Sequence, residues 1–556
     1  MIIATRTMVH PSTSRLRAAI GVCTTKGARL AGAFAYVLLV LGPGLALCIG
    51  LSRIPPATWP DLLVPRGRRP DLLWRSGALA AAVALGAMAT GSLAALRLMQ
   101  WRGRARATLR WLILIFLPFP AVTHAQAWAW LAGQFNRLLQ RQGMIGILFY
   151  GWGVSWWVQM LWLMPIAIGL ALVAFESVDP ALVEAGRMHH AGRRVLTHVV
   201  FPLAMPLLLA GAGVIFVLSL VDYAVPSLFQ VNVYALEVFA DFSAHNQPGR
   251  ALLLAVPLLV TTVAVALLSQ ARLRPAALSP SWRQVSPVGL DQTGWLVTLA
   301  QGALIVVALG MAVPLVSLAL QLGPWSHFAA SVAAAGPEIG YTLRVALVTA
   351  LLSLPLAYCA ARGALQQRYR WLWWLAITAP LAVPGPLIGI GLIGIWNSTL
   401  GHDLAIYGSP VMPVLASLAR YTPFGALVLV ATLRRLNPSL LEAARVLRPG
   451  GLRTWLWVSL PLHAPGLAAA YGLVFCLTLC ELSATLLVAA PGQGTLSLRI
   501  YNYLHYGASD TVAGLTLVLT MLVLAPGVVA FCASALVFRR NAAPRLLAQG
   551  PSHDQG

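Results

Sequence analysis

Residues 179–186 read DPALVEAG and residues 437–444 read NPSLLEAA, so one short polar segment occurs twice in the chain. Glu442 follows Glu184 by 258 residues (442 − 184), a little under half of the 556-residue length. Four further pairs keep this offset or one residue more: Pro165 and Pro423, Pro202 and Pro461, Phe216 and Phe475, and Asp222 and Glu481. A repeat of this length predicts two similar bundles within one chain.

The composition excludes an ordinary water-soluble fold. Hydrophobic residues make up 59% of the chain and charged residues only 10%, whereas soluble domains carry about 25% charged residues. The excess apolar surface has to face lipid, where a bilayer core of ~30 Å needs ~20 apolar residues for each helical span. Only helices and closed barrels satisfy the backbone there. Because the apolar runs are long and do not alternate, the sequence predicts an all-α membrane protein.

Twelve apolar runs are long enough to span a bilayer, six in each half of the chain. We expect transmembrane helices at about 31–52, 76–96, 111–132, 151–173, 199–221, 251–270, 294–322, 341–361, 371–395, 410–433, 457–480 and 511–537. An even number of spans in each half makes both halves point the same way. The predicted architecture is therefore two parallel six-span repeats.

The polar stretches divide the chain into five parts. We expect a cytoplasmic N-terminal segment (1–30), a first transmembrane repeat (31–270), a linker (271–292), a second transmembrane repeat (293–538) and a cytoplasmic tail (539–556). The linker is polar and contains proline and serine, which is typical of a connection between units.

The net charge of +23 comes from short basic clusters between the apolar runs. Arginine and lysine collect in cytoplasmic loops of membrane proteins, and an inward N-terminus places most of the 38 basic residues there. This distribution favours topology control over a nucleic-acid partner. The first outer loop is the exception, with five arginines: Arg53, Arg66, Arg68, Arg69 and Arg75.

Both repeated segments lie in predicted inner loops, between the fourth and fifth spans of each half. Asp179 or Asn437 can cap a helix whose first residue is Pro180 or Pro438. A short amphipathic helix, a break containing glycine and the next span follow. A helical loop that projects from the membrane, with one acidic residue and several arginines, suits docking of a soluble cytoplasmic partner.

These loops resemble the EAA motif of ABC importer permeases, in which a coupling helix inserts into a cleft of an ATPase subunit. The resemblance implies that two such helices begin at Glu184-Ala185-Gly186 and at Glu442-Ala443-Ala444. The downstream prolines of the motif match Pro202 and Pro461. The motif glycine, six residues after the glutamate, is replaced by His190 and Arg448, and glycine occurs nearby at Gly192 and Gly450.

The same resemblance implies the partners and the location. A fused permease of this kind binds two cytoplasmic ATPase subunits and receives its solute from a periplasmic binding protein. It lies in the bacterial inner membrane with both termini in the cytoplasm. Fused twelve-span permeases of this size are most similar to the ferric-iron and thiamine group, so either kind of solute fits. The substrate itself stays open between these and phosphonates, polyamines and sulfate.

Asp222 and Glu481 end the fifth and eleventh spans, at matching places in the two halves. A carboxylate at membrane depth is costly and usually functional, so both are candidates for a translocation-path or gate role. The alternative is a carboxylate at the outer interface that meets water or a backbone N–H.

Several chemistries are excluded by the residues themselves. A phosphate-binding loop needs Gly-Lys followed by Ser or Thr, but the only lysine, Lys26, lies between Thr25 and Gly27. We find no catalytic motif, no metal-ligand spacing and no cofactor site, so ATP hydrolysis belongs to another chain. The alternative class is an ion-coupled carrier with parallel repeats, which would rely on Asp222, Glu481 and Arg420. For a third class, an intramembrane enzyme, the sequence lacks a nucleophile–base pair.

Overall fold

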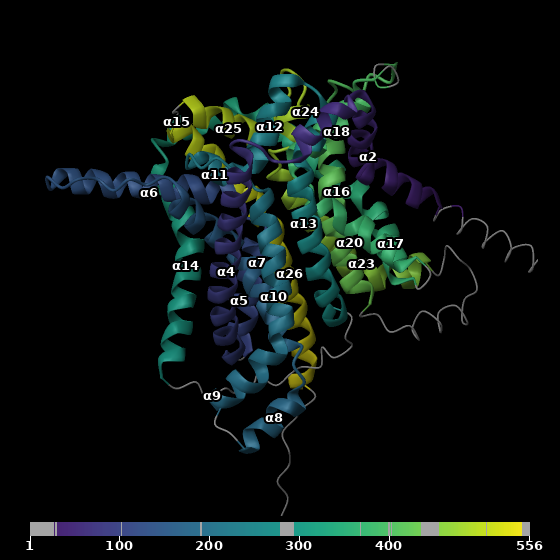
Figure 1. Ribbon diagram of the computed structural model, residues 1–556. Helices are drawn as coiled ribbons and strands as arrows, with labels where there is room; N and C mark the ends of the chain where they lie inside the picture. The colour runs from purple at the N-terminus through teal and green to yellow at the C-terminus, as the bar shows by residue number, and fades with distance from the viewer. Residues whose placement is uncertain are drawn as a thin grey trace, which may run out of the picture.

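The computed structural model describes residues 27, 30–101, 103–189, 192–277, 294–366, 369–398, 401, 403–434, 455–506 and 509–547. These ranges form a bundle of long helices with no strand among them (Figure 1). The all-α prediction is therefore confirmed. Long helices of the first half are α4 (Arg69–Gln100), α5 (Gly103–Phe116), α6 (Ala121–Arg141), α7 (Trp152–Glu176), α10 (Phe201–Val221) and α13 (Pro248–Ala277).

The second half follows the same order. Its long helices are α14 (Trp295–Gln321), α16 (Gly336–Leu365), α17 (Arg370–Thr378), α18 (Gly385–Trp396), α20 (Met412–Leu433), α23 (Leu460–Leu479) and α26 (Ser509–Leu547). Shorter helices connect them: α2 (Gly42–Gly50), α3 (Trp59–Leu63), α8 (Pro180–His189), α9 (Gly192–Val195), α11 (Ala224–Leu228), α12 (Tyr234–His245), α15 (Trp325–Ala334), α24 (Thr485–Val488) and α25 (Leu496–Tyr506).

Among the described residues, ten helical segments are long and apolar enough to cross a membrane, and two bent pairs of helices pass the same test together. The bends measure 96° between α5 and α6 and 105° between the segment 370–382 and α18. At the places of the spans expected at 111–132 and 371–395, the structure therefore has helices bent at a break. Prolines lie at both breaks and remove the backbone donors that a continuous helix needs: Pro118, Pro120, Pro380 and Pro384. Past its bend, α6 projects sideways from the bundle (Figure 1).

The two halves pack alike. Helix α4 packs against α7 and α10, and α16 packs against α20 and α23 in the same pattern. The fourth spans, α7 and α20, each contain an internal proline, Pro165 and Pro423. The fifth spans, α10 and α23, do so as well, at Pro206 and Pro465. The duplication seen in the sequence therefore extends to helix packing.

Two short π-helical segments repeat as well. Segment η4 (Leu196–Val200) leads directly into α10, and η6 (Trp455–Ser459) leads directly into α23. Their starts are 259 residues apart (455 − 196), the offset that relates Pro202 to Pro461. Because π-helical turns are rare and often occur at functional sites, a matched pair is unexpected by chance. The start of each fifth span is therefore a structural feature that the two halves share.

The first span of each half packs against the other half. Segment η1 (Val37–Leu41) contacts α20, and α2 contacts α18, while α14 contacts α4 and α6. Tyr36 is fully buried in the hydrophobic cluster of the second half, and its hydroxyl donates to the carbonyl of Ala376 at 3.3 Å. This exchange joins the two repeats into one bundle.

Candidate functional site

The first of the two predicted docking loops forms α8, which begins as the sequence predicts. The carboxylate of Asp179 accepts a hydrogen bond from the backbone N–H of Ala181 at 2.9 Å, and Pro180 is the first helical residue. A capping carboxylate and a proline at this position both favour the start of a helix. Helices α8 and α9 lie together beyond one end of the bundle (Figure 1).

The motif residues at the start of this loop are exposed to solvent or lie next to α9. Glu184 and Ala185 are exposed, and Gly186 is half-buried. A Cβ on Gly186 would lie 3.4 Å from Val195 Cγ1, an ordinary contact, so the alanine usual at this place in the motif would also fit. Gly192 begins α9, and Pro202 is the second residue of α10.

Two apolar side chains on α8 also face outward. Leu182 is 49% exposed and Met188 is 83% exposed. Val183, on the same short helix, is buried. Exposed apolar side chains that cluster on a projecting helix are typical of an interaction surface. The shape and composition of α8 thus suit insertion into a partner.

The second docking loop falls in 435–454, so Glu442, Ala443, Ala444 and Gly450 lie outside the described residues. The residues that follow this loop are described. Pro461 is the second residue of α23, directly after η6, just as Pro202 is the second residue of α10 after η4. The structure therefore places one loop and the continuation of the other. Among the described residues, no group of three or more His, Cys, Asp or Glu side chains could hold a metal ion.

At the far end of α10, Asp222 belongs to a buried polar network. Its Oδ2 accepts a hydrogen bond from Gln159 Nε2 at 2.9 Å, and Ser219 Oγ donates to Gln159 Oε1 at 2.7 Å. Gln159 lies on α7 and is fully buried. The backbone N–H groups of Ala224 and Val225 also point to the Asp222 carboxylate, at 3.2 and 3.4 Å. Asp222 thereby caps the short helix α11.

Glu481 holds the matching place after α23, and it is 3% exposed. Its Oε1 lies 3.1 Å from Arg420 Nη1 and accepts a hydrogen bond from the backbone N–H of Ala484 at 2.7 Å. The hydroxyl of Tyr421 donates to the other carboxylate oxygen. Both carboxylates therefore accept a hydrogen bond from a backbone N–H at the start of the next helix, which is one of the two arrangements expected from the sequence. Each carboxylate also contacts side chains of a neighbouring span.

The cluster around Asp222 and the cluster around Glu481 interact electrostatically across the boundary between the halves. Burial raises the pKa of the Asp222 carboxyl, one residue beyond its span; the hydrogen bonds to it and the positive charge of Arg420 oppose that rise. The buried Tyr223 side chain interacts electrostatically with Glu481 and Arg420. Residues 222–223 of the first half thus lie within electrostatic range of residues 420 and 481 of the second. The two clusters together are called the polar network below.

The sequence singled out Asp222, Glu481 and Arg420 but not their neighbours in the network. Gln159 and Tyr421 lie inside apolar runs and carry no motif. Gly385 stands at the start of α18, where a Cβ would collide with the Arg420 guanidinium and the Ser483 side chain. The only signal for the glycine is its place in the VPGP stretch (383–386), where the second broken span bends.

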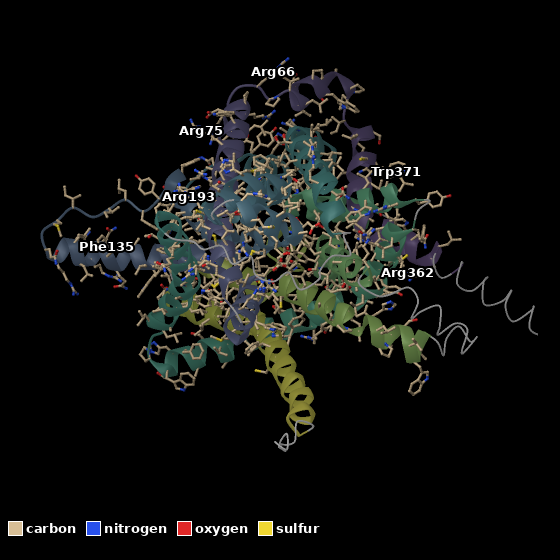
Figure 2. The ribbon with its side chains drawn as sticks, turned by 90° about the horizontal axis from the view of Figure 1, so that it is seen from below. Arg66, Arg75, Phe135, Arg193, Arg362 and Trp371 are labelled. Carbon is tan, nitrogen blue, oxygen red and sulfur yellow. The ribbon has the colours of Figure 1, made fainter. Side chains whose placement is uncertain are left out.

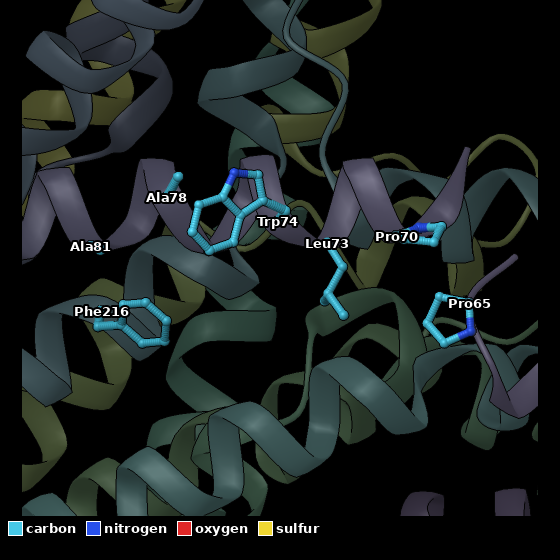
Figure 3. Close-up of a pocket in the computed structure, with 8 residues that line it drawn as sticks. Pro65, Pro70, Leu73, Trp74, Ala78, Ala81 and Phe216 are labelled. Atoms are coloured by element: carbon cyan, nitrogen blue, oxygen red, sulfur yellow. The ribbon is translucent and has the colours of Figure 1, made fainter. Parts of the chain in front are cut away.

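A pocket of about 540 Å³ lies against α4 and α10 (Figure 3). It is lined by Pro65, Pro70, Leu73, Trp74, Gly77, Ala78, Ala81 and Phe216. This lining includes none of the network residues.

Duplicated spans, a projecting helical loop and a buried polar network between the halves define a multi-pass helical protein of the transport class. No family model matches the chain. It is similar to the putrescine transport system permease protein PotI of Escherichia coli (strain K12), 29% identical over 165 residues, or 29% of this chain and 57% of that protein. It is also similar to the ferric transport system permease protein FbpB of Actinobacillus pleuropneumoniae, 24% identical over 411 residues, or 67% of this chain and 58% of that protein.

A third relative is matched over more of its own length. The molybdenum transport system permease protein ModB of Mycobacterium tuberculosis is 31% identical over 214 residues, or 34% of this chain and 77% of that protein. The chain thus spans over half the length of the putrescine and ferric permeases and most of the molybdenum permease. It belongs to the permease subunits of ABC importers and is a multi-pass inner-membrane protein. This assignment separates it from ion-coupled carriers.

Proposed function

We propose that this chain supplies both membrane halves of an ABC importer and forms the path of a small solute delivered by a periplasmic binding protein. The observation that carries the proposal is the helix α8, which projects from one end of the bundle with Glu184, Leu182 and Met188 exposed. Two cytoplasmic ATPase subunits bind there, one at α8 and one at the matching loop that contains Glu442. Both chain termini lie on this cytoplasmic side.

The ATPases and the polar network are connected through the segment that follows each docking loop. In both halves, the loop continues through a π-helical segment into the fifth span, which ends next to Asp222 or Glu481. ATP binding draws the two ATPases and their loops together, and the fifth spans transmit this movement to the polar network. The ATPases thereby shift the population between outward-open and inward-open states.

Asp222 and Glu481 act in this scheme at the outer gate. Closed, the network holds the halves together through Arg420, Tyr223 and both carboxylates. Open, it offers charged groups to the passing solute, which must bind weakly enough to leave. The electrostatic interaction of Asp222 and Tyr223 with Arg420 supports a gate, because it crosses the boundary that has to part.

Ferric iron is the first substrate to test, with a thiamine-like solute second. The match to a ferric transport permease extends over 67% of this chain, further than the matches to the putrescine and molybdenum permeases. Both network carboxylates are hard oxygen donors, which suit a hard cation in transit. A separate binding protein would hold the metal, so this chain needs no resident metal site.

Photo-cross-linking tests the docking face directly. A benzophenone amino acid replaces Met188 on α8, or Ile305 on α14, which is 60% exposed. We expect a cross-linked product with the ATPase from position 188 and none from position 305. Equal yields from both positions, or none from position 188 in an assembled complex, would reject the docking assignment.

A further inference from the structure

The arginine-rich segment 53–75, which includes the start of α4, lies beside the apolar pocket. Residues 53–75 carry five arginines and two aspartates, a surplus of three positive charges. Asp61 pairs with Arg66, and Asp71 pairs with Arg75 at 2.9 Å. Arg53 and Arg68 are exposed and form no ion pair with any described residue. Such a surplus conflicts with the usual charge distribution of outer loops and therefore needs its own cause.

The pocket has the dimensions and lining of a lipid-chain groove. It runs along α4 from Pro70 to Ala81, about 16 Å at 1.5 Å per residue, close to the ~15 Å of hydrocarbon in one leaflet. Its lining is almost entirely apolar, and Trp74 and Phe216 face the same space from α4 and α10 (Figure 3). Trp74 is 75% exposed, as expected of a tryptophan at a membrane interface.

The groove lies in the leaflet opposite the docking loops. Helix α10 starts on the α8 side and ends at Val221, and Phe216 lies five residues before that end. The arginines lie at its mouth, because Pro65 and Pro70 line the pocket among them. Seen along the bundle, Arg66 and Arg75 lie at the rim of the molecule rather than over its middle (Figure 2). A lateral position faces lipid, whereas a partner that delivers solute would sit over the middle.

We propose that this loop and groove bind one phospholipid with an anionic headgroup in the periplasmic leaflet. The phosphate lies among Arg66, Arg68 and Arg69, and one acyl chain fills the groove along Trp74 and Gly77. Naming the leaflet rests on the proposed function, which sets the α8 side as cytoplasmic. The bound lipid accounts for the positive outer loop, since the charges neutralise a headgroup held next to the protein.

Two variants test the two parts of the site separately. Gly77→Leu fills the groove, because a Cβ there has no atom within 4 Å. Gly302→Leu on α14 is its control, an exposed helical glycine with the same open space. Arg66→Gln/Arg68→Gln removes two charges at the mouth. The melting temperature of each purified full-length variant shows that it remains folded.

Native mass spectrometry then measures retention of palmitoyl-oleoyl phosphatidylglycerol, with the phosphatidylcholine of the same chains and inorganic phosphate as comparison ligands. We expect one tightly retained phosphatidylglycerol in the unsubstituted chain and in Gly302→Leu. Retention should be lost in Gly77→Leu and should weaken about fivefold for each arginine removed.

Three results would overturn the proposal. Unchanged retention in Gly77→Leu would show that no chain occupies the groove. Equal competition by inorganic phosphate would reduce the site to a simple anion site. Loss of binding-protein association in Arg66→Gln/Arg68→Gln, with lipid retention unchanged, would assign the arginines to a protein partner. Cross-linking from position 188 is independent of all three, so failure of the lipid site and failure of the importer assignment are told apart.

Discussion

Arg420 Nη1 lies 3.1 Å from Glu481 Oε1, and this ion pair joins α20 to the end of α23 within the second half. Glu481 is nearly fully buried, and its carboxylate oxygens contact the guanidinium, the Tyr421 hydroxyl and the Ala484 N–H. Burying two charges is costly, and a buried pair is more often retained for specificity or switching than for stability.

Removing one partner of this pair should destabilise the bundle strongly. Arg420→Met leaves the Glu481 carboxylate buried without its cation, which costs about 3–5 kcal/mol. The double variant Arg420→Met/Glu481→Met removes both charges and should recover most of that loss. Melting temperatures of the purified variants check this double-mutant cycle. Equal melting temperatures for Arg420→Met and the unsubstituted chain would show that the pair is not coupled.

The carboxylates should matter for transport more than for assembly. Asp222→Asn and Glu481→Gln keep size and most hydrogen bonds but remove the negative charge from the gate. We expect uptake by the reconstituted complex to fall while ATPase association is unchanged. Ser353→Ala, which removes a buried hydroxyl in α16 bonded only to its own helix at Ala350, serves as the control. Uptake at the unsubstituted rate in both carboxylate variants would remove them from the path.

The repeat predicts matched energetics at matched hydroxyls. Ser76 Oγ accepts a hydrogen bond of 2.8 Å from the backbone N–H of Tyr234, and Thr342 Oγ1 accepts one of 2.8 Å from that of Leu496. Ser76→Ala and Thr342→Val each leave a buried N–H without its acceptor, so each should cost about 1–3 kcal/mol. Denaturation of the two variants measures the cost, and a large cost in one half with none in the other would contradict structural equivalence.

Gly385 makes room for the ion pair. A Cβ at this position would overlap the Arg420 guanidinium and the Ser483 side chain. Gly385→Ala should therefore displace Arg420, cost about 1–3 kcal/mol and lower uptake. Gly394→Ala on the same helix is the matched control, since a Cβ there lies 3.9 Å from its nearest neighbour, Pro248. Identical stability of the two alanine variants would argue against close packing at Gly385.

Much of this architecture follows from the residues alone. Hydropathy predicts the membrane class, and the repeated segments predict two equivalent bundles, because apolar length and sequence offset are local properties of the chain. Pro118 and Pro380 mark the bends, yet hydropathy does not distinguish a straight span from a broken one, so the two bends were missed. The exchange of first spans, which buries Tyr36 in the opposite half, has no local signal.

The polar network also has members that the sequence predicts and members that it does not. Asp222 and Glu481 stand out because charged residues are rare in apolar runs. Their partners do not, since Gln159 and Tyr421 become neighbours only when α7 and α20 pack against the ends of the fifth spans. The roles of Glu184 and Glu442 rest on the motif resemblance, and they stay predictions.

One measurement tests the central claim most directly: co-purification of the ATPase with the double variant Glu184→Arg/Glu442→Arg. The exposed pair Asp61→Arg/Asp403→Arg, outside both docking loops, carries the same change of charge as a control. We expect the docking variant to lose the ATPase while its melting temperature is unchanged, and the control variant to retain it. Undiminished co-purification with the docking variant would contradict the account.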